Sequence, residues 1–259
     1  MCSSDLVDIP TRAGSMATFV THPAGDGPYP PVVIYMDVWG VREELYDIAR
    51  RVATVGYYCM VPDLYYRQGT VRHAYRDAEN RMISMEKLDE PRKETVRMSM
   101  RALTDAMVVE DSAALLEFID RGEPVRTGGV GAIGYCMGGR HVFRVAGELP
   151  ERFTAVASLH GTRLVTDQPD SPHHTAEKAR GEIYCGFAEH DPYAPLSTVN
   201  LLAQALPAAG VRYHHAMHMG AEHGYALPDR DIFDKQAANR DWESIFAMFH
   251  RQIPPHFGA

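Results

Sequence analysis

Apolar residues gather in short runs that alternate with longer segments of helical periodicity. Four short runs are mostly apolar, at residues 31–37, 57–61, 153–159 and 183–188. Strands without polar alternation are typical of a parallel sheet that helices cover on both faces. The spacing of apolar residues predicts helices at 43–56, 102–120, 138–147, 196–209 and 232–252, and further strands at 128–135 and 211–217. The alternation of the two kinds of segment predicts an α/β fold.

Residues 67–101 depart from this alternation, because they are rich in Arg, Glu, Asp and Met. Two or three short helices or loops are expected there, interrupted at Pro91, and the segment could cover a site as a lid. Gly122 is expected to end the helix that precedes the glycine-rich strand. The sequence contains no internal repeat and no long linker, so residues 1–259 are predicted to form one domain.

Composition and charge narrow the class of protein. Hydrophobic residues make up 45% and charged residues 23% of the chain, which is typical of a globular protein. The net charge is −8 with Lys and Arg scattered, so neither nucleic acid nor an anionic membrane is expected as a partner. The sequence shows neither a secretion signal nor an apolar run of about 18 residues, the length of a membrane helix. With four cysteines and no CxxC pair, we expect a reducing, cytoplasmic location.

The strongest chemical signal is Gly134-Tyr135-Cys136-Met137-Gly138, which lies between a predicted strand and a predicted helix. A nucleophile on such a turn has strained backbone geometry, so its neighbours must be small. The turn exposes the Cys136 side chain and the N–H of Met137 to one space, and the helix dipole favours a thiolate. The other cysteines are expected in the core (Cys59, Cys185) or on a mobile terminus (Cys2).

An acid and a histidine follow in the order that this motif requires. Asp191 comes three residues after the apolar run 183–188, and His223 lies in a loop after the last predicted strand. The order nucleophile, acid, histidine is that of the α/β-hydrolases. We therefore predict a triad in which His223 takes the thiol proton and Asp191 orients the imidazole.

The chain resembles the dienelactone hydrolase (carboxymethylenebutenolidase) family from about residue 30 to 250. The resemblance lies in residues 35–41, 62–65, 134–139, 190–191 and 222–225. It implies an α/β-hydrolase fold, with a mostly parallel central sheet and helices on both faces. It also implies hydrolysis of a lactone or ester through an acyl-cysteine intermediate, with no metal and no organic cofactor.

The same resemblance suggests roles for further residues. Asp37 stands where the family has a glutamate that activates the thiol, so Asp37 is expected to tune Cys136. The amide of Val38 would join that of Met137 as the second oxyanion donor. The family's carboxylate-binding arginine after the histidine is absent here, and Arg230 is near that position but does not align. A second such arginine would come from residues 80–97, with the candidates Arg81, Arg92, Lys93 and Arg97, of which Arg81 is selected.

Four residues near the motifs could line a substrate pocket or pack in the core. These are Trp39, Tyr135, His160 and Tyr225. Aromatic side chains commonly line small-molecule pockets, and ligands gather at the carboxyl ends of parallel strands. Both alternatives stay open for each of the four.

Three other kinds of function compete with the hydrolase. His214, His215, His218 and His223 could bind a metal, but adjacent residues on a strand point to opposite faces, so no metal is expected. The glycines of 128–134 could bind a nucleotide, but they lie within a strand. A non-catalytic small-molecule-binding member of the fold is the main alternative. The expected partner is a small lactone or ester, and the expected state is a monomer or small homo-oligomer.

Overall fold

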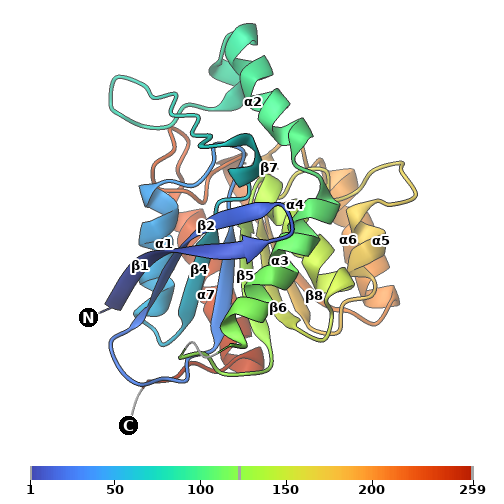
Figure 1. Ribbon diagram of the computed structural model, residues 1–259. Coiled ribbons are helices and arrows are strands. Elements are labelled where there is room, and N and C mark those ends of the chain that lie inside the picture. Colours follow the sequence, from blue (N-terminus) through green and yellow to red (C-terminus); the bar gives the residue numbers. More distant parts are fainter. Residues whose placement is uncertain (1, 122–123, 258–259) are drawn as a thin grey trace.

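The computed structural model describes residues 2–121 and 124–257, and within them eight strands form one sheet (Figure 1). The strand order is β1-β2-β4-β3-β5-β6-β7-β8. Strands β3 to β8 run parallel to one another, whereas β2 pairs antiparallel with both β4 and β1, so β1 and β2 form an antiparallel hairpin at one edge. The strand bounds are β1 Cys2–Thr11, β2 Gly14–Pro23, β3 Pro31–Tyr35, β4 Tyr58–Pro62, β5 Val130–Tyr135, β6 Phe153–Leu159, β7 Glu182–His190 and β8 Arg212–Glu222.

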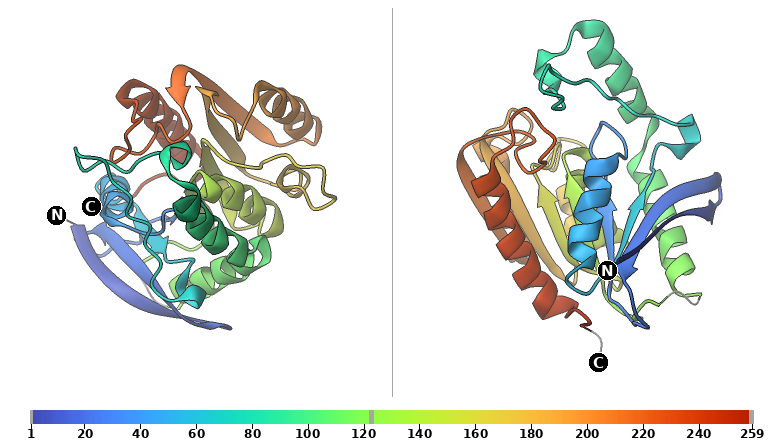
Figure 2. Two further views of the ribbon diagram at one scale, coloured as in Figure 1. Left: turned by 90° about the horizontal axis from the view of Figure 1, so that it is seen from above. Right: turned by 90° about the vertical axis from the view of Figure 1, so that its left-hand side faces the viewer.

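Helices cover both faces of the sheet. Helices α1 (Glu43–Ala53) and α7 (Lys235–Gln252) lie together on one face, where the Arg51 guanidinium sits 4.5 Å from the ring centre of Trp242. The other face carries α3 (Asp105–Ile119), α4 (Met137–Glu148), α5 (Pro172–Ala176) and α6 (Leu196–Ala208) (Figure 2). The mostly parallel sheet between two helical layers confirms the predicted α/β-hydrolase architecture. Among the described helices, none combines the length and apolar character needed to cross a membrane.

The segment 67–101 contains one longer helix. Short 3₁₀ turns occur at Tyr66–Gln68 (η1) and Met85–Lys87 (η2), and helix α2 runs over Glu90–Ala102. The predicted interruption at Pro91 is wrong, because Pro91 lies in the first turn of α2, where its missing N–H has no intrahelical partner to lose. Helix α2 rises beyond the carboxyl ends of the parallel strands (Figure 1).

The hairpin of β1 and β2 is absent from the prediction. Strand β1 is polar and mostly exposed, so it lacks the apolar run that marks the inner strands. Cys2 is not on a mobile terminus but in β1, opposite Pro23. Cys59 and Cys185 are buried, as predicted. Helix α3 ends at Ile119, and the predicted stop at Gly122 lies outside the described residues.

Candidate active site

Cys136 occupies a strained turn between β5 and α4, with φ 54° and ψ −112°. Such positive φ is costly for a residue with a side chain, so the surrounding structure must hold it. The Cys136 N–H donates to the Leu159 carbonyl (3.0 Å), and the Cys136 carbonyl accepts from the N–H groups of Gly139 (3.0 Å) and Thr162 (3.1 Å). A Cβ at position 134 would lie 2.0 Å from the Gly138 carbonyl oxygen, so the turn requires glycine there.

The structure brings Cys136, His223 and Asp191 together at the carboxyl edge of the sheet. Asp191 directly follows β7 and His223 directly follows β8. The Nδ1 atom of His223 lies 2.8 Å from Asp191 Oδ2, and the same imidazole hydrogen-bonds the Cys136 side chain. The other carboxylate oxygen of Asp191 accepts from the backbone N–H of Tyr193 at 2.8 Å. The three residues therefore have the connectivity of a nucleophile, its base and the group that orients the base.

The electrostatics of His223 favour its charged form. Burial alone would lower the pKa of the imidazole, but the Cys136 sulfur and the Asp191 carboxylate outweigh it and raise that pKa to about 10. A protonated imidazole beside a sulfur is the arrangement that stabilises a thiolate. The protein shields the Cys136 sulfur and the His223 ring from solvent, because only 7% of Cys136 is exposed.

Asp37 does not make the expected contact with the thiol. Its side chain is fully buried, and Arg42 donates to both carboxylate oxygens at 2.8 and 3.0 Å. The backbone N–H of Trp39 also donates to Asp37 at 3.1 Å. The guanidinium and this N–H are the hydrogen-bond partners of the carboxylate among the described residues, and the tuning of Cys136 by Asp37 stays a prediction.

A cavity of about 200 Å³ opens beside Cys136. Val38 lines it, while Met137 is the first residue of α4; the oxyanion role of their amides stays a prediction. Three arginines line the same cavity, two of them on loops that follow the sheet. The lining residues are Val38, Trp39, Met85, Glu86, Arg97, Met100, Cys136, Thr162, Arg163, Tyr193, His223 and Arg230.

Arg81, selected as a substrate ligand, does not line this cavity. Its side chain is 49% exposed and pairs with Asp77 (2.9 Å) and Glu79 (3.3 Å) on its own loop. Arg97, another candidate from the same segment, does line it, because α2 carries it back over the sheet. Local acidic neighbours thus hold Arg81 at the surface.

Of the four predicted lining residues, only Trp39 lies on the cavity wall. Tyr135, His160 and Tyr225 are fully buried behind it. The His160 ring packs edge-on against those of His223 (5.1 Å between ring centres) and Tyr225 (5.4 Å). Within the described part of the chain, neither ring nitrogen of His160 has a hydrogen-bond partner, and burial holds its pKa well below the usual value. His160 is therefore a neutral packing neighbour of His223.

Sequence reasoning missed Glu86, Arg163 and Tyr193, which also line the cavity. Arg163 follows β6 by four residues and Tyr193 follows β7 by three. Because ligands bind at the carboxyl ends of parallel strands, the positions of Arg163 and Tyr193 after β6 and β7 could have identified them as pocket residues. Glu86 lies in η2 and carried no comparable signal.

The histidines of β8 do not converge. His214 is exposed, His218 bonds Asp241 at 2.7 Å, and His223 pairs with Asp191. Within residues 2–121 and 124–257, the ligand atoms that could surround a metal ion belong to His173, His174 and Glu177 on and beside α5.

The glycines of β5 serve packing. A Cβ at Gly131 would lie 2.6 Å from the Ile253 side chain, and one at Gly134 would meet the turn of α4. Both glycines lie within the strand, where they allow its neighbours to approach, and no loop cradle for a phosphate forms from them. The glycine run thus has a structural explanation that needs no nucleotide.

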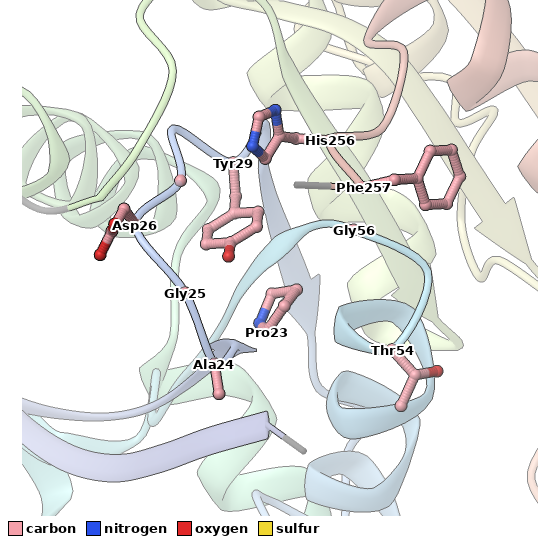
Figure 3. Close-up of a pocket in the computed structure, with 10 residues that line it drawn as sticks. Pro23, Ala24, Gly25, Asp26, Tyr29, Thr54, Gly56, His256 and Phe257 are labelled. Carbon is pink, nitrogen blue, oxygen red and sulfur yellow. The ribbon is translucent and has the colours of Figure 1, made fainter. Parts of the chain in front are cut away.

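A larger opening, of about 590 Å³, lies at the amino ends of the parallel strands, opposite to the carboxyl ends where Cys136 lies. It is formed by residues around the amino ends of β3 and β4, among them Gly25, Tyr29, Gly56 and His256 (Figure 3). The parallel strands point away from this opening and toward Cys136, so size alone does not mark the reactive centre.

Comparisons with known proteins agree with this architecture. The model of the dienelactone hydrolase family matches residues 16–253. A "Putative carboxymethylenebutenolidase" of Synechocystis sp. is 26% identical over 252 residues, which cover 96% of each chain. The crystal structure of a "Putative Dienelactone Hydrolase" from Klebsiella pneumoniae has a TM-score of 0.81 at 25% identity, covering 97% of this chain and 99% of that one. A "Dienelactone Hydrolase-like Promiscuous Phospotriesterase" from metagenomic libraries shares the fold, with a TM-score of 0.75 at 19% identity over 97% and 98% of the chains.

Proposed function

The chain belongs to the dienelactone hydrolase family and is a hydrolase of ester or lactone bonds, and on that premise we propose that Cys136 is its nucleophile. The observation that carries the proposal is the hydrogen-bonded series Cys136–His223–Asp191 at the strained turn. A thiol next to a base that a carboxylate orients is the arrangement of nucleophilic catalysis. The cavity of about 200 Å³ beside Cys136 suits a small substrate.

In the acylation step, the Cys136 sulfur attacks the carbonyl carbon while His223 carries the proton of the thiol. The carbonyl oxygen becomes an oxyanion, for which the amides of Met137 and Val38 are the proposed donors. When the tetrahedral intermediate collapses, the bond to the leaving oxygen breaks. His223 protonates an alkoxide leaving group, whereas an enolate or phenolate can leave unprotonated, and His223 then releases its proton to solvent before deacylation. A thiolate is a better leaving group than an alkoxide, so cysteine favours lactones and esters with a stabilised leaving group.

In the deacylation step, water attacks the acyl-cysteine with His223 as the general base. The proton that water loses passes to His223 and then to the departing sulfur, so the enzyme returns to its starting state. Asp191 accepts from Nδ1 throughout, which keeps the other ring nitrogen directed at the reacting atoms.

The substrate class that the cavity favours is a carboxylate-bearing ester or lactone. Arg230 is only 4% exposed, and in the part of the chain that the structure describes it has no carboxylate partner. Its guanidinium lies 5.4 Å from the ring centre of Trp39 and donates only a long 3.4 Å bond to the Met82 carbonyl. A buried, unpaired guanidinium is costly, and an anionic substrate would compensate it. Arg163 adds a second guanidinium without an ion pair among the described residues.

If the protein only bound its ligand without catalysis, an interaction with a neighbouring residue would have to keep the Cys136 thiol protonated. Asp37 was the residue expected to make that interaction, and its carboxylate is bound by Arg42 instead. His223 meanwhile has a pKa raised to about 10 by Cys136 and Asp191, which favours the charged imidazole beside the sulfur. These two observations support the hydrolase over the binding protein.

The test compares wild type, Cys136→Ala and the matched control Cys2→Ser under reducing conditions. The substrates are a dienelactone, which carries a carboxylate, and neutral p-nitrophenyl acetate. We expect wild type and Cys2→Ser to turn over the substrates and Cys136→Ala to lose at least about 10³-fold in kcat, as removal of a nucleophile does. Equal activity in Cys136→Ala would overturn the nucleophile, and no turnover of either substrate by wild type would favour the binding protein.

A further inference from the structure

Arg42 joins two carboxylates that belong to different parts of the site. Its guanidinium donates to Asp37 at 2.8 and 3.0 Å and to Asp229 at 2.7 and 3.2 Å. Only 11% of its side chain is exposed, as is 11% of Asp229 and none of Asp37. The two carboxylates outweigh the effect of burial and raise the pKa of Arg42 further above its usual value. Arg42 therefore stays charged while binding Asp37 nearby and Asp229, which lies 187 positions further along the chain.

The bridge has two arms, the ion pair of Arg42 with Asp37 and the ion pair of Arg42 with Asp229. The first arm holds the loop that carries Val38, the proposed oxyanion donor. Asp37 follows β3 and directly precedes Val38. Its carboxylate also accepts from the Trp39 N–H, and Arg42 donates to the Gly40 carbonyl at 3.3 Å. The loop of residues 37–42 is thus closed by its own arginine, which fixes the direction of the backbone at Val38.

The second arm reaches the loop that carries the buried guanidinium of Arg230. Asp229 directly precedes Arg230, and the Asp229 carbonyl accepts from the Met82 N–H at 2.7 Å. Arg42 makes two hydrogen bonds to the Asp229 carboxylate, with Arg76 as a more distant cation at 4.0 Å. A carboxylate held this way is kept from its neighbour in the chain, so Arg230 remains available to a ligand.

We propose that Arg42 is a positioning residue that holds the oxyanion loop through Asp37 and keeps Arg230 free for an anionic substrate through Asp229. This inference rests on the proposed function, because it assigns the two arms to transition-state stabilisation and to substrate binding. It goes beyond the triad by naming the residue that sets the spacing between the reacting carbonyl and the substrate's negative group.

The two arms can be separated with two substrates that share a leaving group. The probes are neutral p-nitrophenyl acetate and mono-p-nitrophenyl succinate, which adds a carboxylate. The variants are Asp37→Asn, Asp229→Asn, Arg42→Lys and the matched control Arg50→Met. Arg50 lies on α1, the helix that begins directly after Arg42, and makes exposed ion pairs with Glu43 and Asp47.

Each variant has its own expected kinetic signature. Asp37→Asn should lower kcat about tenfold on both substrates, a part of the 10²–10³ that loss of an oxyanion donor costs. Asp229→Asn should raise KM for the succinate ester about fivefold more than KM for the acetate ester, since the substrate-binding arm alone is cut. Arg42→Lys should show both effects, because one ammonium cannot bond both carboxylates in a bidentate way. Arg50→Met should resemble wild type.

A purely structural role would lower the melting temperature without changing kcat or the ratio of the two KM values. That result, or identical changes on both substrates in Asp229→Asn, would overturn the inference. Failure of the proposed function looks different, because Cys136→Ala would then keep the activity of wild type on p-nitrophenyl acetate.

Discussion

The ring of Tyr193 packs edge-on against the imidazole of His223, with 4.7 Å between the ring centres. The same residue donates its backbone N–H to Asp191 and its hydroxyl to Glu86 Oε1 at 2.6 Å. Tyr193 is thus in contact with the acid, the base and the η2 turn of segment 67–101. This places the segment against the cavity, where Met85, Glu86, Arg97 and Met100 form part of the wall.

Tyr193→Phe should loosen η2 while leaving the ring against His223. We expect KM to rise about threefold to tenfold with a smaller change in kcat, as loss of one hydrogen bond worth about 1 kcal/mol suggests. Trypsin should also cleave more quickly between Arg81 and Arg97. Glu79→Gln is the control, because Glu79 is exposed and its ion pair with Arg81 is outside the cavity. An unchanged KM together with unchanged cleavage would contradict a restraining role of the Tyr193–Glu86 bond.

The titration of His223 should depend on Cys136. With its pKa raised to about 10 in the folded protein, the charged imidazole stabilises the fold fully below about pH 6.5, its usual pKa in an unfolded chain. That contribution is lost as the pH rises through about 10. Cys136→Ser removes the sulfur that raises the pKa of His223, so we expect that pKa to fall by at least about one unit in an NMR titration of the imidazole. Equal midpoints in the two proteins would show that Cys136 does not raise the pKa of His223.

Asp241 should be a major determinant of stability. This buried carboxylate on α7 accepts from the hydroxyls of Tyr184 (2.7 Å) and Tyr225 (2.6 Å) and lies 2.7 Å from His218 Nε2. Asp241→Ala leaves these polar groups buried without their partner, so the free energy of unfolding should fall by about 3–5 kcal/mol. Urea denaturation measures the loss. Glu243→Gln, an exposed neighbour on α7, should change stability by less than about 0.5 kcal/mol.

The fold was predictable where local sequence carries the signal. Mostly apolar runs located the inner strands, and the glycines around Cys136 predicted a turn that only small neighbours permit. Strand β1 could not be found this way, because its exposed polar residues form a strand only through pairing with β2. Tertiary pairing there overrides weak local preference.

The sequence predicted that Cys136, Asp191 and His223 lie close together, but it did not predict which charged residues pair around them. Cys136, Asp191 and His223 each follow a strand, so parallel topology alone brings them to one edge. The partner of Asp37 could not be inferred, since the bridge through Arg42 to Asp229 spans distant parts of the chain. Choosing among Arg81, Arg92 and Arg97 likewise depended on where α2 begins and on which acids lie nearby.

Arg230→Met should separate stability from substrate binding. In the described structure the Arg230 guanidinium is buried without a carboxylate partner, so removing its charge relieves a desolvation cost. We expect the free energy of unfolding to rise by about 1 kcal/mol, the scale of a single favourable core change. KM for mono-p-nitrophenyl succinate should rise about tenfold or more, while KM for p-nitrophenyl acetate changes far less. Only the succinate ester has a carboxylate, and that carboxylate loses the Arg230 guanidinium as its partner. Arg212→Gln, on the exposed edge of β8, is the matched control for loss of a positive charge. Lower stability together with equal KM changes on both esters would mean that Arg230 supports the fold and does not bind the substrate anion.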